Sequence, residues 1–192
     1  NGRFGKMEVQ VKELDSAGIK LICDYWLNSS VEHLTSMGVD LSKVPNRESL
    51  TSMLEEQLTL PLDKRSSFAL LWYLEGQAIG HCNVNQIQFG EQAHMHLHIW
   101  SQEQRAKGYG LALLKMSIPI FFQKLKLQEL YCEPYALNPA PNKILSKLGF
   151  KFIKKYITLH KVFLLNKWCR QVSKIQKKSC TPGQAIIKDC LN

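Results

Sequence analysis

Residues 93–114 read AHMHLHIWSQEQRAKGYGLALL and contain the clearest change of pattern in the chain. Residues 93–99 alternate between apolar side chains and histidine, which is the period of a β-strand with two different faces. A polar loop with two glycines follows, and leucines at helical spacing come next. The stretch therefore predicts a strand, a glycine-bearing turn and a helix, in that order.

The turn has the composition of an anion-binding loop. Gly108 and Gly110 carry no side chain, so backbone amides and the positive end of a helix dipole can approach a phosphate group. The loop lacks the Lys-Ser/Thr pair of a Walker sequence, and Leu113 replaces the third glycine of a dinucleotide fingerprint. A turn that binds no ligand can have the same composition, so this motif alone leaves both interpretations open.

Apolar periodicity elsewhere predicts an α/β fold. The elements follow the order β-α-α-β-β-β-α-β-α-β-β, which is typical of a mixed sheet covered by helices. The expected strands cover residues 7–14, 68–74, 77–89, 93–100, 127–133, 150–153 and 156–165, and the expected helices cover 16–26, a short turn at 31–38, 46–60, 111–125 with a bend at Pro119, and 142–148.

Length and composition indicate one ordinary domain, expected over residues 7–165. The chain has 192 residues, of which 45% are hydrophobic and 21% are charged, enough to bury a core. The longest apolar run, Phe68–Leu74, is far shorter than the roughly 20 residues of a membrane-spanning helix, so no span is expected. Residues 1–6 lack the apolar region of a secretory signal, and we interpret them as a cloning remnant or disordered chain.

The formal charge of +9 is concentrated at the end of the chain. Residues 1–150 hold 15 Lys and Arg against 15 Asp and Glu, whereas residues 151–192 hold 10 against Asp189 alone. We therefore interpret residues 166–192 as a basic C-terminal extension. Such a tail can bind polyanions, but solvated lysines on a terminal helix give the same count. No aromatic residues interleave with the last lysines, so a nucleic-acid partner is not expected.

Cysteine and histidine spacing gives no metal site. The six cysteines contain no CxxC pair and no histidine at zinc-finger spacing, and no secretory signal accompanies them. Reduced thiols and a cytoplasmic location are therefore expected. His94, His96 and His98 could hold a metal ion from one strand face, but no carboxylate lies near them in the sequence, so no metal is expected.

Two motifs carry a resemblance to a known family. The first is Arg105-x-x-Gly108-x-Gly110 after a strand, and the second is Asn138 followed by Lys147-Leu-Gly-Phe150. Together they resemble the GNAT superfamily of acetyl-CoA-dependent N-acetyltransferases, and the second is most similar to the ribosomal-protein (Rim-type) branch. The resemblance extends from about residue 8 to residue 165. It implies a splayed, mostly antiparallel sheet whose separated strands admit the pantetheine arm of coenzyme A.

The resemblance also implies where the co-substrate acetyl-CoA binds. Backbone amides of the glycine turn would cradle the pyrophosphate, and main-chain groups at the end of the preceding strand would bind the pantetheine amides. Asn138 matches the family asparagine near the cofactor arm. The implied cofactor-binding residues are His98, Ile99, Trp100, Arg105, Ala106, Lys107, Gly108, Tyr109, Gly110 and Asn138.

The sequence departs from the family pattern at the proton donor. Many relatives place a tyrosine four residues before the glycine of the Gly-Phe pair, where this chain has Leu145. The Rim-type serine, three residues after the asparagine, is Pro141. Tyr135, Cys132 or a water molecule must then act as the acid, if one is needed. A coenzyme A thiolate is a tolerable leaving group near neutral pH.

A base is needed because an acceptor amine is mostly protonated at pH 7. Histone-acetylating relatives carry a glutamate on this strand, eleven residues before the Arg or Gln of the loop, and here that position is His94. Histidine suits the task because its ordinary pKa is about 6.5. The three histidines could equally tile one strand face without a catalytic role. The candidate catalytic residues are His94, His96, Glu133 and Tyr135.

The sequence thus predicts an enzyme that transfers an acetyl group from acetyl-CoA to an amine of a small molecule or protein by direct attack. We expect a monomer or homodimer without a membrane partner. A transferase that uses a longer acyl-CoA is one alternative. A catalytically inactive CoA-binding module with a basic polyanion-binding tail is the other, and the loss of both usual acid positions keeps it open.

Overall fold

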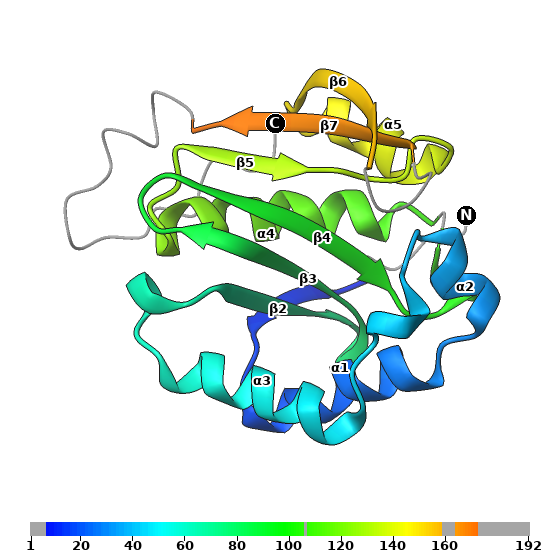
Figure 1. The fold of residues 1–192 in the computed structure, drawn as a ribbon, viewed down its shortest axis with the longest axis vertical. Helices are drawn as coiled ribbons and strands as arrows, with labels where there is room; N and C mark the ends of the chain where they lie inside the picture. Colours follow the sequence, from blue (N-terminus) through cyan, green and yellow to red (C-terminus); the bar gives the residue numbers. More distant parts are fainter. Residues whose placement is uncertain (1–6, 106, 159–163, 173–192) are drawn as a thin grey trace, which may run out of the picture.

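The structure, a computed structural model, describes residues 7–105, 107–158 and 164–172. Seven strands form one sheet in the order β1-β2-β3-β4-β5-β7-β6, with helices on both of its faces (Figure 1). The mixed fold is confirmed, and the elements follow the predicted order except that Val31–Ser36, expected as part of a short turn, forms an additional helix. The strands are β1 (Val9–Glu13), β2 (Ser67–Leu74), β3 (Gln77–Gln88), β4 (Gln92–Ile99), β5 (Glu129–Cys132), β6 (Lys151–Ile157) and β7 (Leu164–Gln171). The helices are α1 (Ser16–Asn28), α2 (Val31–Ser36), α3 (Arg47–Thr59), α4 (Tyr109–Lys124) and α5 (Pro139–Lys147), with 3-10 turns at Leu41–Lys43, Leu62–Lys64 and Gln102–Gln104.

Helices α1 and α3 begin where the sequence offers side-chain caps. The Asp15 carboxylate accepts a hydrogen bond from the Gly18 amide at 2.8 Å. The Asn46 side chain accepts one from the Ser49 amide at 2.9 Å. Each cap satisfies an amide that has no partner within its own helix. Both predicted helix starts are therefore confirmed.

Alternate residues of β2 divide the core into two layers. Leu70 and Trp72 pack in the layer that contains α4, where the Trp72 indole donates to the Ser117 hydroxyl at 2.9 Å. Leu71 packs on the opposite face, against α1 and α3. Helix α5 belongs to the α4 layer, in which Leu145 is fully buried. The pleat of the strand thus decides which helices cover each face.

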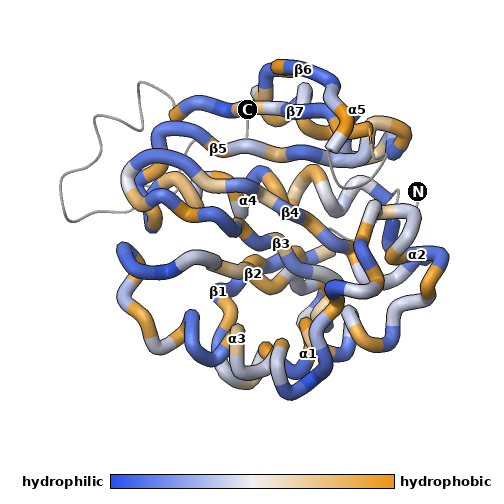
Figure 2. The backbone as a smooth tube through the Cα atoms, viewed as in Figure 1, coloured by the Kyte–Doolittle hydropathy of each residue, from blue (hydrophilic) through white to orange (hydrophobic). Residues whose placement is uncertain are grey.

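The alternation along β4 separates a buried face from an accessible one. Hydrophobic and hydrophilic positions follow one another along this strand (Figure 2). Ala93 and Met95 are buried in the α4 layer. His94 and His96 point to the other face, and His96 is exposed. The helices on that side, α1 and α3, lie along the β1–β3 part of the sheet (Figure 1), so His96 lies on an accessible surface and His94 lies close to it.

The sheet opens between β4 and β5. These strands run parallel and pair only from Gln92 with Glu129 to Met95 with Cys132. Beyond Met95, β4 continues to Ile99 and pairs with β3 alone. The chain after Cys132 pairs instead with β7, through the bridge of Tyr135 with Leu165. The splayed sheet implied by the resemblance is confirmed.

The last two strands differ from their predicted positions. Strand β6 runs without a break to Ile157, whereas the sequence suggested a break before Tyr156. A β-bulge between Phe152 and Lys154 shifts the register, so the simple alternation used for the prediction does not hold there. Strand β7 covers Leu164–Gln171 and lies between β5 and β6. The domain boundary expected at residue 165 therefore falls inside a strand, and residues 166–171 belong to the sheet.

Removal of residues 173–192 is expected to leave this sheet intact. The truncated chain keeps Val172, which follows β7 and whose amide donates to the Gln128 carbonyl at 2.8 Å. The removed segment holds four lysines and Asp189, so the formal charge falls by 4 − 1 = 3. Calorimetry should show an unchanged Tm. A truncation that begins at residue 170 removes paired residues of β7 and should lower the Tm by roughly 2–8 °C. Equal melting of both truncations would show that the end of β7 contributes nothing to stability.

Other predictions concern membranes and thiols. Among the described residues, no helix has both the length and the hydrophobicity needed to cross a bilayer. Cys23, Cys82, Cys132 and Cys169 are buried free thiols. Cys169 lies on β7 and therefore not in a tail. Cys180 and Cys190 lie outside the described residues.

Candidate functional site

The glycine turn leads directly into α4. Gly108 is the N-cap of this helix, with φ 84°, and no described side chain caps the helix start. A Cβ added to Gly108 would meet nothing within 4 Å. Glycine is thus required here by the left-handed backbone and not by crowding. The space beside the turn and the uncapped helix start suit an anionic ligand.

Gly110 lies in the first turn of α4 and is buried. A Cβ at this position would lie 3.4 Å from Ile99 Cδ1 and 3.9 Å from Ile144 Cδ1, which is ordinary contact. The turn therefore packs against the end of β4 on one side and α5 on the other. Lys107 and Tyr109 are the other described residues of the turn, whereas Ala106 lies outside the described residues.

The Arg105 side chain fastens the loop to the end of β4. Its Nε donates to the Ile99 carbonyl at 3.0 Å, and its Nη2 donates to the Trp100 carbonyl at 3.2 Å. The Trp100 amide donates to the Ile79 carbonyl at 2.9 Å. The carbonyls expected to face the cofactor arm thus already accept hydrogen bonds within the protein. Arg105 also reaches His33 Nε2 on α2, at 3.1 Å.

His98 belongs to an aromatic cluster on the α1 side of the sheet. Its ring stacks on His81 at 4.7 Å between centroids, and its Nδ1 lies 3.2 Å from the Tyr25 hydroxyl. The Trp100 indole donates to His81 Nδ1 at 2.8 Å. Burial lowers the pKa of His81 to about 3 and also lowers that of His98. Both rings are therefore neutral, and the His98 side chain serves packing, while the predicted cofactor contact of His98 involves its main chain and stays a prediction.

His94 and Glu133 come together across the two diverging strands. His94 Nδ1 lies 3.9 Å from Glu133 Oε2, and both side chains are mostly buried. The His94 ring stacks on Tyr131 at 5.3 Å between centroids. The Tyr156 hydroxyl donates to Glu133 Oε2 at 2.9 Å, and Lys167 Nζ lies 3.4 Å from Glu133 Oε1. The carboxylate is thus held by β6 and β7 while it faces the histidine of β4.

The surroundings tune His94 toward its neutral form. Burial lowers its pKa, Glu133 opposes this shift, and the Lys167 ammonium adds to it. His94 is therefore unprotonated at pH 7. Burial, together with the hydrogen bond to Glu133, raises the pKa of Tyr156 to about 12, so this hydroxyl keeps its proton.

The other proposed residues lie around this pair. His96 is the first β4 residue beyond the stretch paired with β5, and its Nε2 lies 3.2 Å from Asn85 Oδ1. Tyr135 follows Glu133 in the chain, and its backbone pairs with Leu165. The three β4 histidines make separate contacts, and no metal-ligating cluster occurs within the described part of the chain.

Donor and acceptor rules fix an amide network at the N-terminus of α5. Asn142 Nδ2 donates to the carbonyls of Tyr135 and Asn138, at 3.1 and 2.7 Å, so its Oδ1 must be the acceptor. That oxygen accepts from Asn166 Nδ2 at 2.9 Å and from Trp168 Nε1 at 3.0 Å. Asn166 Oδ1 is left buried, with no donor among the described residues. A buried oxygen of this kind favours a hydrogen-bond donor, such as an N–H group of a ligand or a water molecule.

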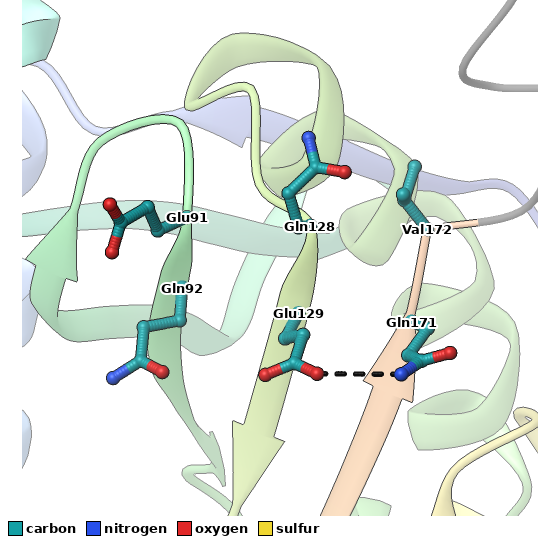
Figure 3. A pocket seen from close by; sticks show the side chains of 6 residues that line it. All are labelled: Glu91, Gln92, Gln128, Glu129, Gln171 and Val172. Carbon is teal, nitrogen blue, oxygen red and sulfur yellow. Dashed lines mark hydrogen bonds between the residues drawn. The ribbon is translucent and has the colours of Figure 1, made fainter.

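A separate depression lies at the opposite end of β4 and β5 (Figure 3). Its volume is about 330 Å³. Glu129 and Gln171 meet there at 3.4 Å. It contains neither the glycine turn nor the His94–Glu133 pair, so it is not the site described here. Its lining residues are Glu91, Gln92, Gln128, Glu129, Gln171 and Val172.

Several residues of the site carry no local sequence signal. The sequence predicts Lys167 in a basic extension, whereas it lies on β7. It predicts Tyr156 at the start of the last strand, whereas this residue lies on β6. Their approach to Glu133 depends on the insertion of β7 between β5 and β6, which no sequence period reveals. His33 reaches Arg105 from a helix distant in sequence. For Asn166 a signal was available: it lies two residues before Trp168, so in a strand the two side chains share one face.

Comparison with known proteins decides the family. The model described as "Acetyltransferase (GNAT) domain" matches residues 18–151. The chain belongs to the GNAT acetyltransferase family. Members of this family use acetyl-CoA as co-substrate, and this GNAT acetyltransferase accordingly has the glycine turn and the splayed sheet. No curated protein matches its sequence significantly.

Solved structures share the fold at low sequence identity. The ribosomal-protein-S5-alanine acetyltransferase of Vibrio fischeri has a TM-score of 0.72 at 16% identity, covering 89% of this chain and 97% of the other. RimL, the ribosomal L7/L12 alpha-N-protein acetyltransferase in complex with coenzyme A, has a TM-score of 0.71 at 12% identity, with 85% and 94% coverage. The spermidine N-acetyltransferase of Vibrio cholerae, in complex with CoA and spermine, gives 0.70 at 12% identity, with 85% and 95% coverage.

Proposed function

We propose that this GNAT acetyltransferase transfers the acetyl group of acetyl-CoA directly to an amine, with His94 as the base. The observation that carries the proposal is the 3.9 Å separation of His94 Nδ1 and Glu133 Oε2 at the point where β4 and β5 diverge. A neutral imidazole next to a carboxylate can take a proton and stabilise the resulting charge. The free, buried thiols of the described cysteines favour a cytoplasmic location.

The reaction balances without a covalent enzyme intermediate. His94 removes a proton from the acceptor ammonium, and Glu133 stabilises the imidazolium that forms. The freed nitrogen attacks the thioester carbonyl, so that a C–N bond forms and the C–S bond breaks. The tetrahedral nitrogen loses its second proton to the coenzyme A thiolate, directly or through water, which gives the free thiol. Tyr156 and Lys167 keep the Glu133 carboxylate in place during these steps.

The described residues fit the co-substrate at two places. The uncapped start of α4, preceded by the left-handed Gly108, suits the pyrophosphate. The orphaned Asn166 Oδ1 suits an amide N–H such as those of the pantetheine arm. Asn138, the N-cap residue of α5, uses no side-chain hydrogen bond to cap its helix, which leaves its amide available to the arm.

The residue at the position of the family's tyrosine cannot be the proton donor to the thiolate. Leu145 is fully buried and apolar, so it cannot protonate the thiolate. Cys132 faces the core on the α4 side, and burial raises its pKa to about 12, so it is a poor donor to this site. Tyr135 or a water molecule remains as the donor.

Thiol release from acetyl-CoA with a panel of amines tests the proposed function, with binding of coenzyme A followed by calorimetry. The proposal requires both CoA binding and acceptor-dependent thiol release, with the acetylated amine identified by mass. CoA binding without turnover for any amine would instead support the inactive binding module. A higher rate with a longer acyl-CoA than with acetyl-CoA would support the second alternative.

The Glu133→Gln variant is expected to lower kcat/KM roughly tenfold. Glutamine can still accept the Tyr156 hydrogen bond, but it no longer stabilises protonated His94. Because Glu133 raises the pKa of His94, loss of its charge should move the acidic limb of the pH profile to lower pH. Glu129→Gln, at the other end of β5, makes the same change of charge and should leave the profile unchanged. A loss larger than that of His94→Ala would identify Glu133 itself as the base.

A further inference from the structure

Half of the basic residues of the C-terminal segment lie on two strands beside the site. Residues 151–192 hold 10 Lys and Arg, and five of these belong to β6 and β7. Neither strand contains an acidic residue. The charge is therefore part of the folded sheet, next to the opening between β4 and β5. The five residues are Lys151, Lys154, Lys155, Lys167 and Arg170.

Strand register decides which of these charges face the site. Lys154 pairs directly with Lys167, so the two side chains share a face. Lys167 Nζ lies 4.5 Å from the centre of the Tyr131 ring, which places this face on the side of His94 and Glu133. Lys155 pairs with Asn166 and points to the opposite face, where α5 lies.

The pair of lysines is costly and only partly neutralised. Like charges directly opposite one another across two strands are destabilising. Glu133 neutralises Lys167, but among the described residues no carboxylate pairs with Lys154. The Lys154 side chain is exposed, and its ammonium lies over the face of the Tyr156 ring, 5.4 Å from the ring centre. An anionic group bound next to this pair would relieve the repulsion.

The same charges disfavour a polyamine. Each additional ammonium group of a polyamine needs a carboxylate or an aromatic face free of other cations. Near the opening, Glu133 is already engaged by Tyr156 and Lys167. Glu129 lies at the far end of β5 and accepts the Tyr131 hydroxyl at 2.6 Å. A second ammonium on the acceptor would meet lysines instead.

We propose that the acceptor is an amine with a carboxylate or phosphate close to its amino group, held by Lys154 and Lys167. This inference rests on the proposed function, because the amino group must lie at His94 and Glu133. Such an acceptor is the N-terminus of an acidic peptide or a small anionic amine. In both cases the amino group binds next to Glu133 and His94, and the anionic group binds to Lys154 and Lys167.

Matched peptides test the charge preference. Three peptides that begin with Ser-Ala and continue with Glu-Glu, Gln-Gln or Lys-Lys are compared by kcat/KM, with spermidine and free aspartate as further acceptors. We expect the acidic peptide to exceed the neutral one roughly 3- to 10-fold, and the lysine peptide and spermidine to be poorer than both. The advantage should shrink in 0.5 M NaCl because exposed charges are screened. Aspartate at least as good as the acidic peptide would identify a small molecule as the source of the anion.

Two lysine variants distinguish binding of the anion at Lys154 from an effect of the overall positive charge of the protein. Lys154→Gln should reduce the ratio of acidic to neutral rates roughly 2- to 5-fold while the neutral rate stays constant. Lys155→Gln, with the same charge change on the opposite face, should leave the ratio unchanged. Equal ratios in both variants, or a preference for spermidine, would overturn the inference without affecting the proposed function.

Binding measurements keep the two proposals distinguishable. Fluorescence anisotropy of labelled peptides on the CoA-loaded protein needs no turnover. Tighter binding of the acidic peptide, lost in Lys154→Gln, would support the anionic site even if no acceptor were acetylated, in which case the proposed function alone would fail. Equal binding of all three peptides would overturn the anionic site.

Discussion

In the His94→Ala variant, kcat/KM for a responsive amine is expected to fall at least tenfold near pH 7, because a positioned base typically contributes roughly 10²–10⁴-fold. The enzyme then depends on the small fraction of acceptor that is already unprotonated. This fraction rises about tenfold per pH unit below the amine pKa, so the deficit should shrink as pH rises. The pKa of His94 is lowered by burial, so the wild-type rate should persist below the usual titration range of histidine. Thiol release measured from pH 5.5 to pH 9.5 gives both profiles.

Two controls separate proton transfer from packing. His94→Gln keeps a polar side chain beside Tyr131 but supplies no base, so it should show the same pH-dependent loss as alanine. CoA affinity should remain unchanged, because His94 lies on the face opposite the α4 layer that carries the glycine turn. A loss of equal size at every pH would indicate damaged positioning instead. An unaltered rate would transfer the role of base to His96, Glu133 or a water chain.

Local patterns predicted the part of the site that lies on one continuous segment. The alternation of β4 placed His94 and His96 on one face, and the two glycines placed a turn before α4. These features depend on the period of a strand and on the absence of side chains, both of which can be read from neighbouring residues. Capping by Asp15 and Asn46 was predictable for the same reason.

Contacts between distant segments were not predictable in this way. The sequence predicts a basic extension from residue 166, because the inward-facing residues of this part of β7 are polar or aromatic and its lysine and arginine resemble a solvated segment. The insertion of β7 between β5 and β6 brings Lys167 to Glu133 and Asn166 to Asn142. Similarly, Arg105 was expected to serve the cofactor, and only the folded loop shows that its guanidinium holds the end of β4 and reaches His33.

The Gly108→Ala variant is expected to weaken CoA binding about tenfold while the protein stays folded. The added methyl group meets nothing within 4 Å, so steric clash within the protein cannot be the cause. Alanine at φ 84° costs about 1–2 kcal/mol, and the turn can escape that cost by a change of backbone that moves the amides at the start of α4. A loss of 1.4 kcal/mol corresponds to a tenfold change in Kd.

Gly110→Ala provides the comparison, because its methyl group would make ordinary contact with Ile99 and no positive φ is involved. If the Gly110 amide approaches the pyrophosphate closely, this variant should also weaken CoA binding, with an unchanged Tm. Calorimetry of CoA binding and of thermal unfolding measures both effects on the same samples. Unchanged CoA affinity in both folded variants would show that the glycine turn only connects β4 to α4. A loss confined to Gly108→Ala would mean that the backbone conformation of the turn, and not close approach at Gly110, determines how the phosphates bind.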